Sequence, residues 1–366
     1  MTPLINQRIV HPSAWKASEF KSKDDYAIDL ESHHLAALER AMERVKDQGL
    51  QLAQINKQSF PLDGIEDLIE QVRHELLEGR GFLLLRGWPV REYSLEDIAM
   101  MYFGFGSHFG KAASQSVMGD RLGYVRDFSH EDENERAYRN KYALDLHTDL
   151  NDLIGMLNIH QSPRGGESQY ASAIAIHNEI FATRPDLLPP LYEGFHYHRR
   201  GEEGPGEGPV TPHKVPIFST VDNVLSCRYV DSYMPAAAKE LGIEMSCELQ
   251  EAITCFERIA ASEEFSLDLK VEPGEMTFSN NLVTLHGRRA FADDATDPTK
   301  KRLFLRLWLD VDAEHARPQV PQLRVYENDS IAKREGRTPV YSGESWRELI
   351  EGRTHLPVDP QGTQAQ

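Results

Sequence analysis

The chain has few cysteines and no long apolar segment. Its three cysteines, Cys227, Cys247 and Cys255, form no Cys-x-x-Cys pair, so neither a disulfide framework nor a zinc knuckle is expected. Such cysteines are typical of the reducing cytoplasm. No apolar run approaches the ~20 residues of a membrane-spanning helix, and residues 1–8 lack the charged-then-apolar order of a signal peptide. These absences predict a cytoplasmic protein with no membrane span.

Positive charge is also scarce. The chain carries 40 basic and 58 acidic residues, which gives a formal charge of −18. Nucleic acids and anionic membranes bind proteins through a positive surface, so neither is expected as a partner. The sequence leaves open whether the protein is a homo-oligomer.

The sequence contains no internal repeat and no Gly-rich phosphate loop. The run Gly104-Phe-Gly106 lacks a third glycine and follows a predicted helix rather than a strand, which argues against a doubly wound α/β fold. Short strands separated by turns instead predict a mainly β protein with flanking helices, built as a β-sandwich or jelly roll. The apolar spacing predicts helices over 62–77, 94–102, 176–181 and 247–261, and strands over 82–85, 122–127, 154–160, 168–173, 225–229, 266–271, 276–278 and 303–311.

Three parts are expected along the chain. Residues 1–60 are polar, and we expect an irregular N-terminal extension that packs on the core through Trp15 and Phe20. Residues 61–315 form the main domain, and residues 316–366 form a C-terminal extension. Within the main domain, residues 201–216 are dense in Gly, Pro and Glu, so this loop is either a solvated insertion or a lid over an active site.

The most informative motif is His147-Thr148-Asp149, read together with the distant His286. Two histidines and one carboxylate are the ligands of non-haem Fe(II) oxygenases, which leave the opposite metal positions open. A His-x-Asp tripeptide also occurs by chance, and a histidine at the end of a partly apolar strand can be an ordinary core residue. The motif therefore needs support from other residues.

Two arginines give that support. Residues 301–310 alternate apolar positions as a half-buried strand does, so Arg302 and Arg306, four residues apart, share one face. A guanidinium turned toward a core needs an anion, and its fork matches a carboxylate. The partner is either an internal Asp or Glu or the carboxylate of a bound cosubstrate.

Together, these motifs resemble the taurine dioxygenase and clavaminate synthase-like family of Fe(II)/2-oxoglutarate oxygenases. The similarity extends from about Gly79 to Asp310, and it implies a double-stranded β-helix (jelly roll) core. The motifs that carry it are His147-Thr-Asp149, Gly165-Gly-Glu-Ser168, Asn281-Leu-Val-Thr-Leu-His286, Phe291 and Arg302-Leu-Phe-Leu-Arg306-Leu-Trp.

The resemblance also implies site residues and cofactors. Iron would be held by His147, Asp149 and His286. Ser168 matches a threonine that hydrogen-bonds 2-oxoglutarate, and Arg302 matches the arginine that pairs with the distal carboxylate of this cosubstrate. Fe(II) is thus the implied metal, and 2-oxoglutarate and O2 are the cosubstrates.

Arg306 matches a position that holds an anionic group of the substrate in the taurine enzyme and stays near the cosubstrate in other members. Leu282 departs from the taurine enzyme, which has an arginine there, and this difference weakens any inference about sulfonate substrates. Asp149 keeps the carboxylate that related halogenases replace by a small residue. This favours hydroxylation, desaturation or oxidative cleavage over halogenation.

We therefore predict an Fe(II)/2-oxoglutarate-dependent dioxygenase that hydroxylates a small polar or anionic metabolite, with release of succinate and CO2. Two alternatives remain from the residues alone: a non-catalytic jelly-roll protein that holds zinc with the same ligands, and a metal-dependent hydrolase. The first would be expected to supply a fourth protein ligand, and the second would leave both arginines without a purpose. The predicted substrate contacts, besides Arg306, are Arg126, Tyr142, Asn151, Arg228 and Tyr229.

Overall fold

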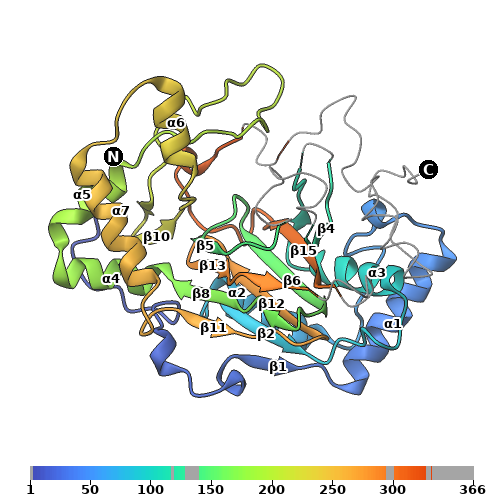
Figure 1. Cartoon of the computed structure of the whole chain (residues 1–366). Helices are drawn as coiled ribbons and strands as arrows, with labels where there is room; N and C mark the ends of the chain where they lie inside the picture. The colour runs from blue at the N-terminus through green and yellow to red at the C-terminus, as the bar shows by residue number, and fades with distance from the viewer. Residues whose placement is uncertain (1–2, 117–118, 128–139, 294–300, 327–330, 332–366) are drawn as a thin grey trace.

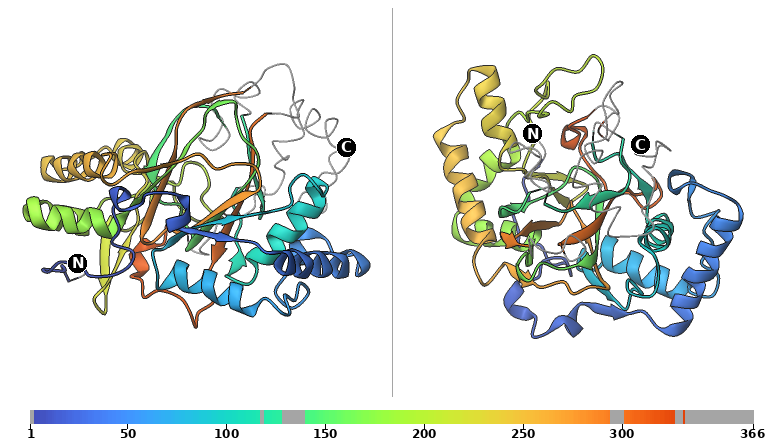
Figure 2. Two further views of the ribbon diagram at one scale, coloured as in Figure 1. Left: turned by 90° about the horizontal axis from the view of Figure 1, so that it is seen from below. Right: turned by 45° about the vertical axis from the view of Figure 1, so that its right-hand side comes forward.

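The computed structural model describes residues 3–116, 119–127, 140–293, 301–326 and 331. Two sheets face each other at its centre, and two groups of helices lie on opposite sides of them (Figure 1). The turned views in Figure 2 keep the same arrangement, with α1 and α3 on one side and α4 and α7 on the other.

The larger sheet has seven strands in the order β1-β2-β12-β6-β15-β3, with β4 also paired to β15. All neighbours are antiparallel except the parallel pair of β1 and β2. The strands are β1 (Ala27–Asp29), β2 (Phe82–Arg86), β3 (Lys111–Ala112), β4 (Gly123–Val125), β6 (Leu153–His160), β12 (Glu275–Asn280) and β15 (Leu303–Asp310).

The smaller sheet has four strands in the order β11-β8-β13-β5. They are β5 (Leu144–His147), β8 (Ser168–Ser172), β11 (Leu267–Leu269) and β13 (Thr284–Arg288). Two further antiparallel pairs join β7 (Arg164–Gly165) to β14 (Phe291–Ala292) and β9 (Phe218–Val221) to β10 (Val224–Cys227).

The sheets pack through side chains that alternate along each strand. In β2, Phe82 and Leu84 point into the space between the sheets, and the Phe82 ring lies 4.4 Å from that of Tyr170 on β8. Leu83 and Leu85 point the other way, into the core beneath the helices. Both faces of the strand are buried, which explains why its sequence is an apolar run without alternation.

The helices form two groups. The first, α1 (Ser32–Asp47), α2 (Glu66–Leu77) and α3 (Leu95–Gly106), shares a core with the outer face of the larger sheet. The second, α4 (Ala173–Thr183), α5 (Leu188–Glu193), α6 (Tyr233–Leu241) and α7 (Cys247–Ala260), shares a core with β8 and β13. Single 3-10 turns lie at Ala17–Glu19, Lys23–Asp25, Leu52–Gln54, Pro185–Leu187 and Pro321–Leu323.

Each of the four predicted helices is present, with shifted ends. The N-terminal region was wrongly expected to be irregular, because it contains the 16-residue helix α1. Its apolar positions do recur at helical spacing: Ala37, Leu38, Ala41, Met42 and Val45 are all buried. Many polar residues between them masked this pattern.

Trp15 and Phe20 of the N-terminal region pack at the edge of the space between the sheets, as expected. The Trp15 ring lies 6.2 Å from the Phe82 ring, and its Nε1 donates to the carbonyl of Arg80 at 3.0 Å. Of the predicted C-terminal extension, residues 327–330 and 332–366 lie outside the described residues. No helix in the described part of the chain is long and apolar enough to cross a membrane.

Candidate active site

Two strands of the smaller sheet bring the predicted metal ligands together. His147 ends β5 and lies directly opposite His286 of β13, so their rings are 4.4 Å apart. Asp149 follows two residues later, with Oδ1 3.7 Å from His147 Nε2 and Oδ2 3.5 Å from His286 Nε2. One ligand atom from each of the three residues lies within 4.8 Å of the others. This arrangement could hold one metal ion with three protein ligands.

Neighbouring groups fix the direction of these ligands. His147 Nδ1 lies 2.7 Å from the carbonyl of Asp145, which can only accept a hydrogen bond, so Nε2 presents its lone pair to the site. Trp308 Nε1 donates to Asp149 Oδ2 at 2.6 Å. Asn281 accepts from the Asp149 amide at 3.2 Å and donates to the carbonyl of Asn151 at 3.0 Å. The turn after β5 is therefore held on both sides of Asp149.

The electrostatics favour the protonation states that bind metal. Burial, together with the nearby His286, lowers the pKa of His147 to about 4, so its imidazole is neutral near pH 7. Burial acts to raise the pKa of the Asp149 carboxyl, but the hydrogen bond and charge of His286 and the Arg306 guanidinium outweigh it and hold this pKa below its usual range. Metal binding requires a neutral imidazole and an ionised carboxylate.

Arg302 lies fully buried in the same cavity as the two histidines, with 1% of its surface exposed. Its guanidinium carbon sits 4.1 Å from the Phe304 ring centre and 5.1 Å from that of Phe291. Its Nε and Nη1 have no hydrogen-bond partner among the described residues. Burial, with the charge of Arg288, lowers the pKa of Arg302 to about 9. A buried cation with unused donors is costly unless an anion joins it, so this end of the cavity suits a carboxylate.

Ser168 and Arg306, the other two predicted cosubstrate residues, also line this cavity. Ser168 is within hydrogen-bonding reach of the Tyr170 hydroxyl on the same strand. Arg306 donates from Nε to Gln115 at 2.7 Å, and its Nη1 lies 3.9 Å from Asp149 Oδ2. Arg306 thus faces the metal-ligand end of the cavity. The cavity encloses about 50 Å³.

The five predicted substrate contacts do not meet at one place, and none of them lines this cavity. Tyr142 is 61% exposed. The Tyr229 hydroxyl donates to Glu257, away from the ligands, and it is the Tyr229 backbone that supports the site by pairing with Thr148. Arg126 is buried, and its charge acts on Asp293 together with that of Arg302.

The remaining two predicted contacts, Asn151 and Arg228, line a different cavity on the far side of Asp149. Asn151 donates to Asp310 at 2.6 Å, and Arg228 donates to the backbone carbonyl of Asp149. The loop 201–216, considered as a lid, contributes no residue to the cavity around the metal ligands. It packs instead toward the end of the described chain, where the Tyr326 hydroxyl donates to Glu202 at 3.0 Å.

Sequence reasoning missed Trp308 and Gln115. Trp308 lies two residues beyond Arg306 on the same face of β15, so the strand alternation contained the signal for it. Gln115 precedes β4 in a stretch without regular structure. It accepts from Arg306 Nε at 2.7 Å and donates to the Arg306 carbonyl at 2.9 Å, a contact that no local pattern reveals.

The facing sheets and the buried group of two histidines and one carboxylate define a non-haem iron oxygenase of jelly-roll fold. The chain belongs to the taurine catabolism dioxygenase TauD, TfdA family, whose model matches residues 46–308. It is therefore an oxidoreductase that uses Fe(II) and 2-oxoglutarate. This decides against the zinc-binding and hydrolase alternatives.

Relatives and solved structures agree with this assignment. The chain is 30% identical over 317 residues to FR-33289 synthase of Streptomyces rubellomurinus (strain ATCC 31215), covering 85% of this chain and 93% of that protein. It is 25% identical over 313 residues to taurine hydroxylase-like protein SAT17 of Stachybotrys chartarum (strain CBS 109288 / IBT 7711), covering 81% and 78%.

Two solved structures show the same fold at low identity. Asparagine oxygenase in complex with Fe(II), 2S,3S-3-hydroxyasparagine and succinate has a TM-score of 0.59 at 12% identity, over 82% of this chain and 98% of that one. The non-haem iron oxygenase OrfP in complex with Fe and α-ketoglutaric acid has a TM-score of 0.58 at 12% identity, over 82% and 99%.

Proposed function

We propose that this protein hydroxylates a small polar or anionic metabolite while 2-oxoglutarate is converted to succinate and CO2. One observation carries the proposal. The buried guanidinium of Arg302, with two unpaired nitrogens, shares a cavity with His147 and His286. A cation in that position matches the distal carboxylate of a cosubstrate whose other end lies at the metal.

In this proposal His147, Asp149 and His286 hold Fe(II), and Ser168 and Arg302 hold 2-oxoglutarate. When bound, Fe(II) and 2-oxoglutarate activate O2, and one oxygen atom enters a C–H bond of the substrate while the other enters succinate. The neutral imidazole of His147 and the ionised carboxylate of Asp149 are ready to bind metal without losing a proton at neutral pH.

Other residues of the chain support that chemistry. Trp308 fixes Asp149 by donating to Oδ2 at 2.6 Å. Arg306 brings positive charge to the metal-ligand end of the cavity, and, after the larger effect of His286, it helps to hold the pKa of Asp149 below its usual range. Phe304 and Phe291 exclude water around Arg302, which strengthens its pairing with a carboxylate.

The relatives support a small polar substrate and hydroxylation. Solved structures of similar fold contain 3-hydroxyasparagine with succinate and, in OrfP, (3S)-hydroxy-L-Arg with succinate. A related protein is described as taurine hydroxylase-like. Asparagine, arginine and taurine are therefore the first compounds to test.

The test has two steps. The first is an anaerobic titration of the protein with Fe(II) and 2-oxoglutarate, followed through the weak visible charge-transfer band of the chelate. In the second step, each compound is added to see whether it shifts the band, and product is then analysed by mass spectrometry after O2 is admitted. We expect a product that gains one oxygen atom together with an equal amount of succinate. Folded, metal-loaded protein with no band would contradict the cosubstrate site, and a product that only loses two hydrogens would contradict hydroxylation.

A further inference from the structure

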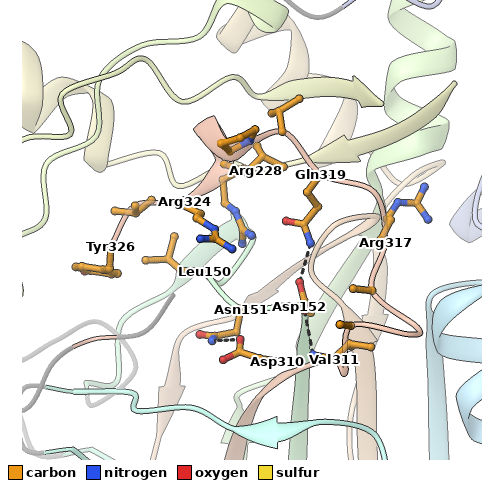
Figure 3. Close-up of a pocket in the computed structure, with 16 residues that line it drawn as sticks. Leu150, Asn151, Asp152, Arg228, Asp310, Val311, Arg317, Gln319, Arg324 and Tyr326 are labelled. Atoms are coloured by element: carbon orange, nitrogen blue, oxygen red, sulfur yellow. Dashed lines mark hydrogen bonds between the residues drawn. The ribbon is translucent and has the colours of Figure 1, made fainter. Parts of the chain in front are cut away.

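A second, larger cavity lies on the opposite side of the metal-ligand turn. It encloses about 590 Å³ between the turn Leu150–Asp152, Arg228 and residues 311–326 (Figure 3). It shares no lining residue with the cavity that contains His147, His286 and Arg302. The two cavities are therefore lined by different parts of the described chain.

Arg228 is the buried charge of this second cavity. Its side chain is 2% exposed, and Nη1 donates to the backbone carbonyl of Asp149. Its Nε has no hydrogen-bond partner within the described parts of the chain. Burial lowers the pKa of Arg228, while the charge of Asp152 opposes that effect. A buried guanidinium with an unused donor beside a cavity needs either water or an anion to complete it.

The acidic residues of the cavity are already engaged. Both carboxylate oxygens of Asp152 accept hydrogen bonds, from the Val311 amide at 3.0 Å and from Gln319 at 2.9 Å. Asp310 accepts from Asn151 at 2.6 Å. These bonds tie both carboxylates to the cavity wall.

Among the described residues, three arginines and two aspartates line the cavity. In Figure 3 the guanidinium groups of Arg228 and Arg324 point toward the same part of it. Arg317 donates to the carbonyl of Leu225 at 2.7 Å. Guanidinium groups bind the oxygens of a phosphoryl group or a carboxylate through charged hydrogen bonds, and the Nε of Arg228 is available for such a bond.

We propose that this cavity is a second ligand site that binds the oxyanion group of a small molecule between Arg228 and Arg324. It is distinct from the 2-oxoglutarate site and does not depend on the proposed substrate. Phosphate and carboxylate share the required chemistry, so the source of the oxyanion is an outcome of the test. Arg228 also donates a hydrogen bond to the backbone carbonyl of Asp149, a predicted metal ligand. An anion bound to Arg228 would therefore contact the side chain that positions this ligand.

The test is calorimetric titration of the full-length protein, saturated anaerobically with Fe(II) and 2-oxoglutarate, with inorganic phosphate or acetate at constant ionic strength. We expect saturable binding of one anion per chain. Arg324→Gln should weaken it about tenfold or more, as expected for the loss of a hydrogen bond between charged groups. Arg324 is solvent-exposed, so this variant should fold even if Arg228→Gln does not.

Two control variants distinguish this cavity from the protein surface and from the 2-oxoglutarate site. Arg91→Gln removes the same charge from an exposed position outside the cavity and should leave the anion affinity within about twofold. Arg302→Gln should also leave it unchanged. Saturable binding of phosphate alone or of acetate alone would support the site and assign its source. Absence of saturable binding for both anions, or loss of binding in Arg302→Gln but not in Arg324→Gln, would overturn the proposal.

Discussion

Replacing Arg302 by glutamine should weaken 2-oxoglutarate binding about a hundredfold. The Nε and Nη1 groups of Arg302 have no partner among the described residues, so each has an N–H available to a bound anion. Hydrogen bonds between charged groups each contribute about 1.5–3 kcal/mol, and a neutral one contributes about 1 kcal/mol. Exchanging two charged bonds for one neutral bond from glutamine therefore loses on the order of 3 kcal/mol, or about two powers of ten in the dissociation constant.

The same substitution should not destabilise the free protein. Arg302 is fully buried, and its pKa is lowered to about 9 by burial, so its charge opposes folding until an anion binds. At a 2-oxoglutarate concentration 100 times the wild-type dissociation constant, the ligand stabilises the wild type by about 2.7 kcal/mol. The same concentration would stabilise Arg302→Gln by only about 0.4 kcal/mol, because it would equal the weakened dissociation constant.

Two assays check this reasoning. Anaerobic titration of the charge-transfer band gives the dissociation constant, and urea unfolding with and without 2-oxoglutarate, with Fe(II) present, gives the ligand-dependent stability. Arg302→Lys keeps the charge but loses the fork, so its affinity should lie between those of the wild type and the glutamine variant. An unchanged 2-oxoglutarate affinity in Arg302→Gln would refute the assignment and move the distal carboxylate to Arg306.

Three further predictions concern the metal ligands, their support and the core. His147→Ala or Asp149→Ala should abolish Fe(II)-dependent turnover with an unchanged circular dichroism spectrum; full activity in either purified variant would contradict the ligand assignment. Trp308→Phe should lower Fe(II) affinity about 10- to 100-fold, as is usual for the loss of a group that orients a ligand, and metal titration would show this. Burial lowers the pKa of His177 to about 4. Below about pH 6.5, His177 is therefore protonated in the unfolded chain but stays neutral in the folded chain. Its contribution should lower the free energy of unfolding by about 2 kcal/mol between pH 7 and pH 5. Urea unfolding of the wild type and of His177→Phe at both pH values would isolate this contribution, and an equal pH dependence in the two proteins would refute it.

The alternation of β15 predicted the positions of Arg302 and Arg306 correctly. The odd-numbered leucines of this strand face the helices, in the core that contains α3. The even-numbered residues face the site, where Arg302, Phe304, Arg306 and Trp308 follow one another. Period-two spacing therefore locates the charged pair, and it places Trp308, whose indole N–H is a hydrogen-bond donor, on the same face.

Substrate contacts could not be predicted in the same way. Arg228 and Tyr229 meet the metal-ligand turn through contacts that span about 80 positions of the chain. The Thr148 amide donates to the Tyr229 carbonyl, and the Tyr229 amide, 81 residues away, donates to the Thr148 hydroxyl. The path of the segment after β10 decides which of its side chains face the metal ligands. This path cannot be predicted from the local amino-acid composition. As a result, the Tyr229 ring turns toward α7, and Arg228 passes behind Asp149 into the second cavity.

Asp149 connects the two cavities through opposite ends of one residue. Its carboxylate lies between the two histidines and accepts from Trp308, and its backbone carbonyl accepts from Arg228. A buried carbonyl that loses its donor is left with the full penalty of desolvation, about 1–3 kcal/mol. The loss of Arg228 should therefore lower Fe(II) affinity as well as anion affinity, even though the guanidinium never reaches the metal. Through this coupling, an anion bound in the second cavity, as proposed, would act on the predicted metal ligands by way of the turn His147–Asp152.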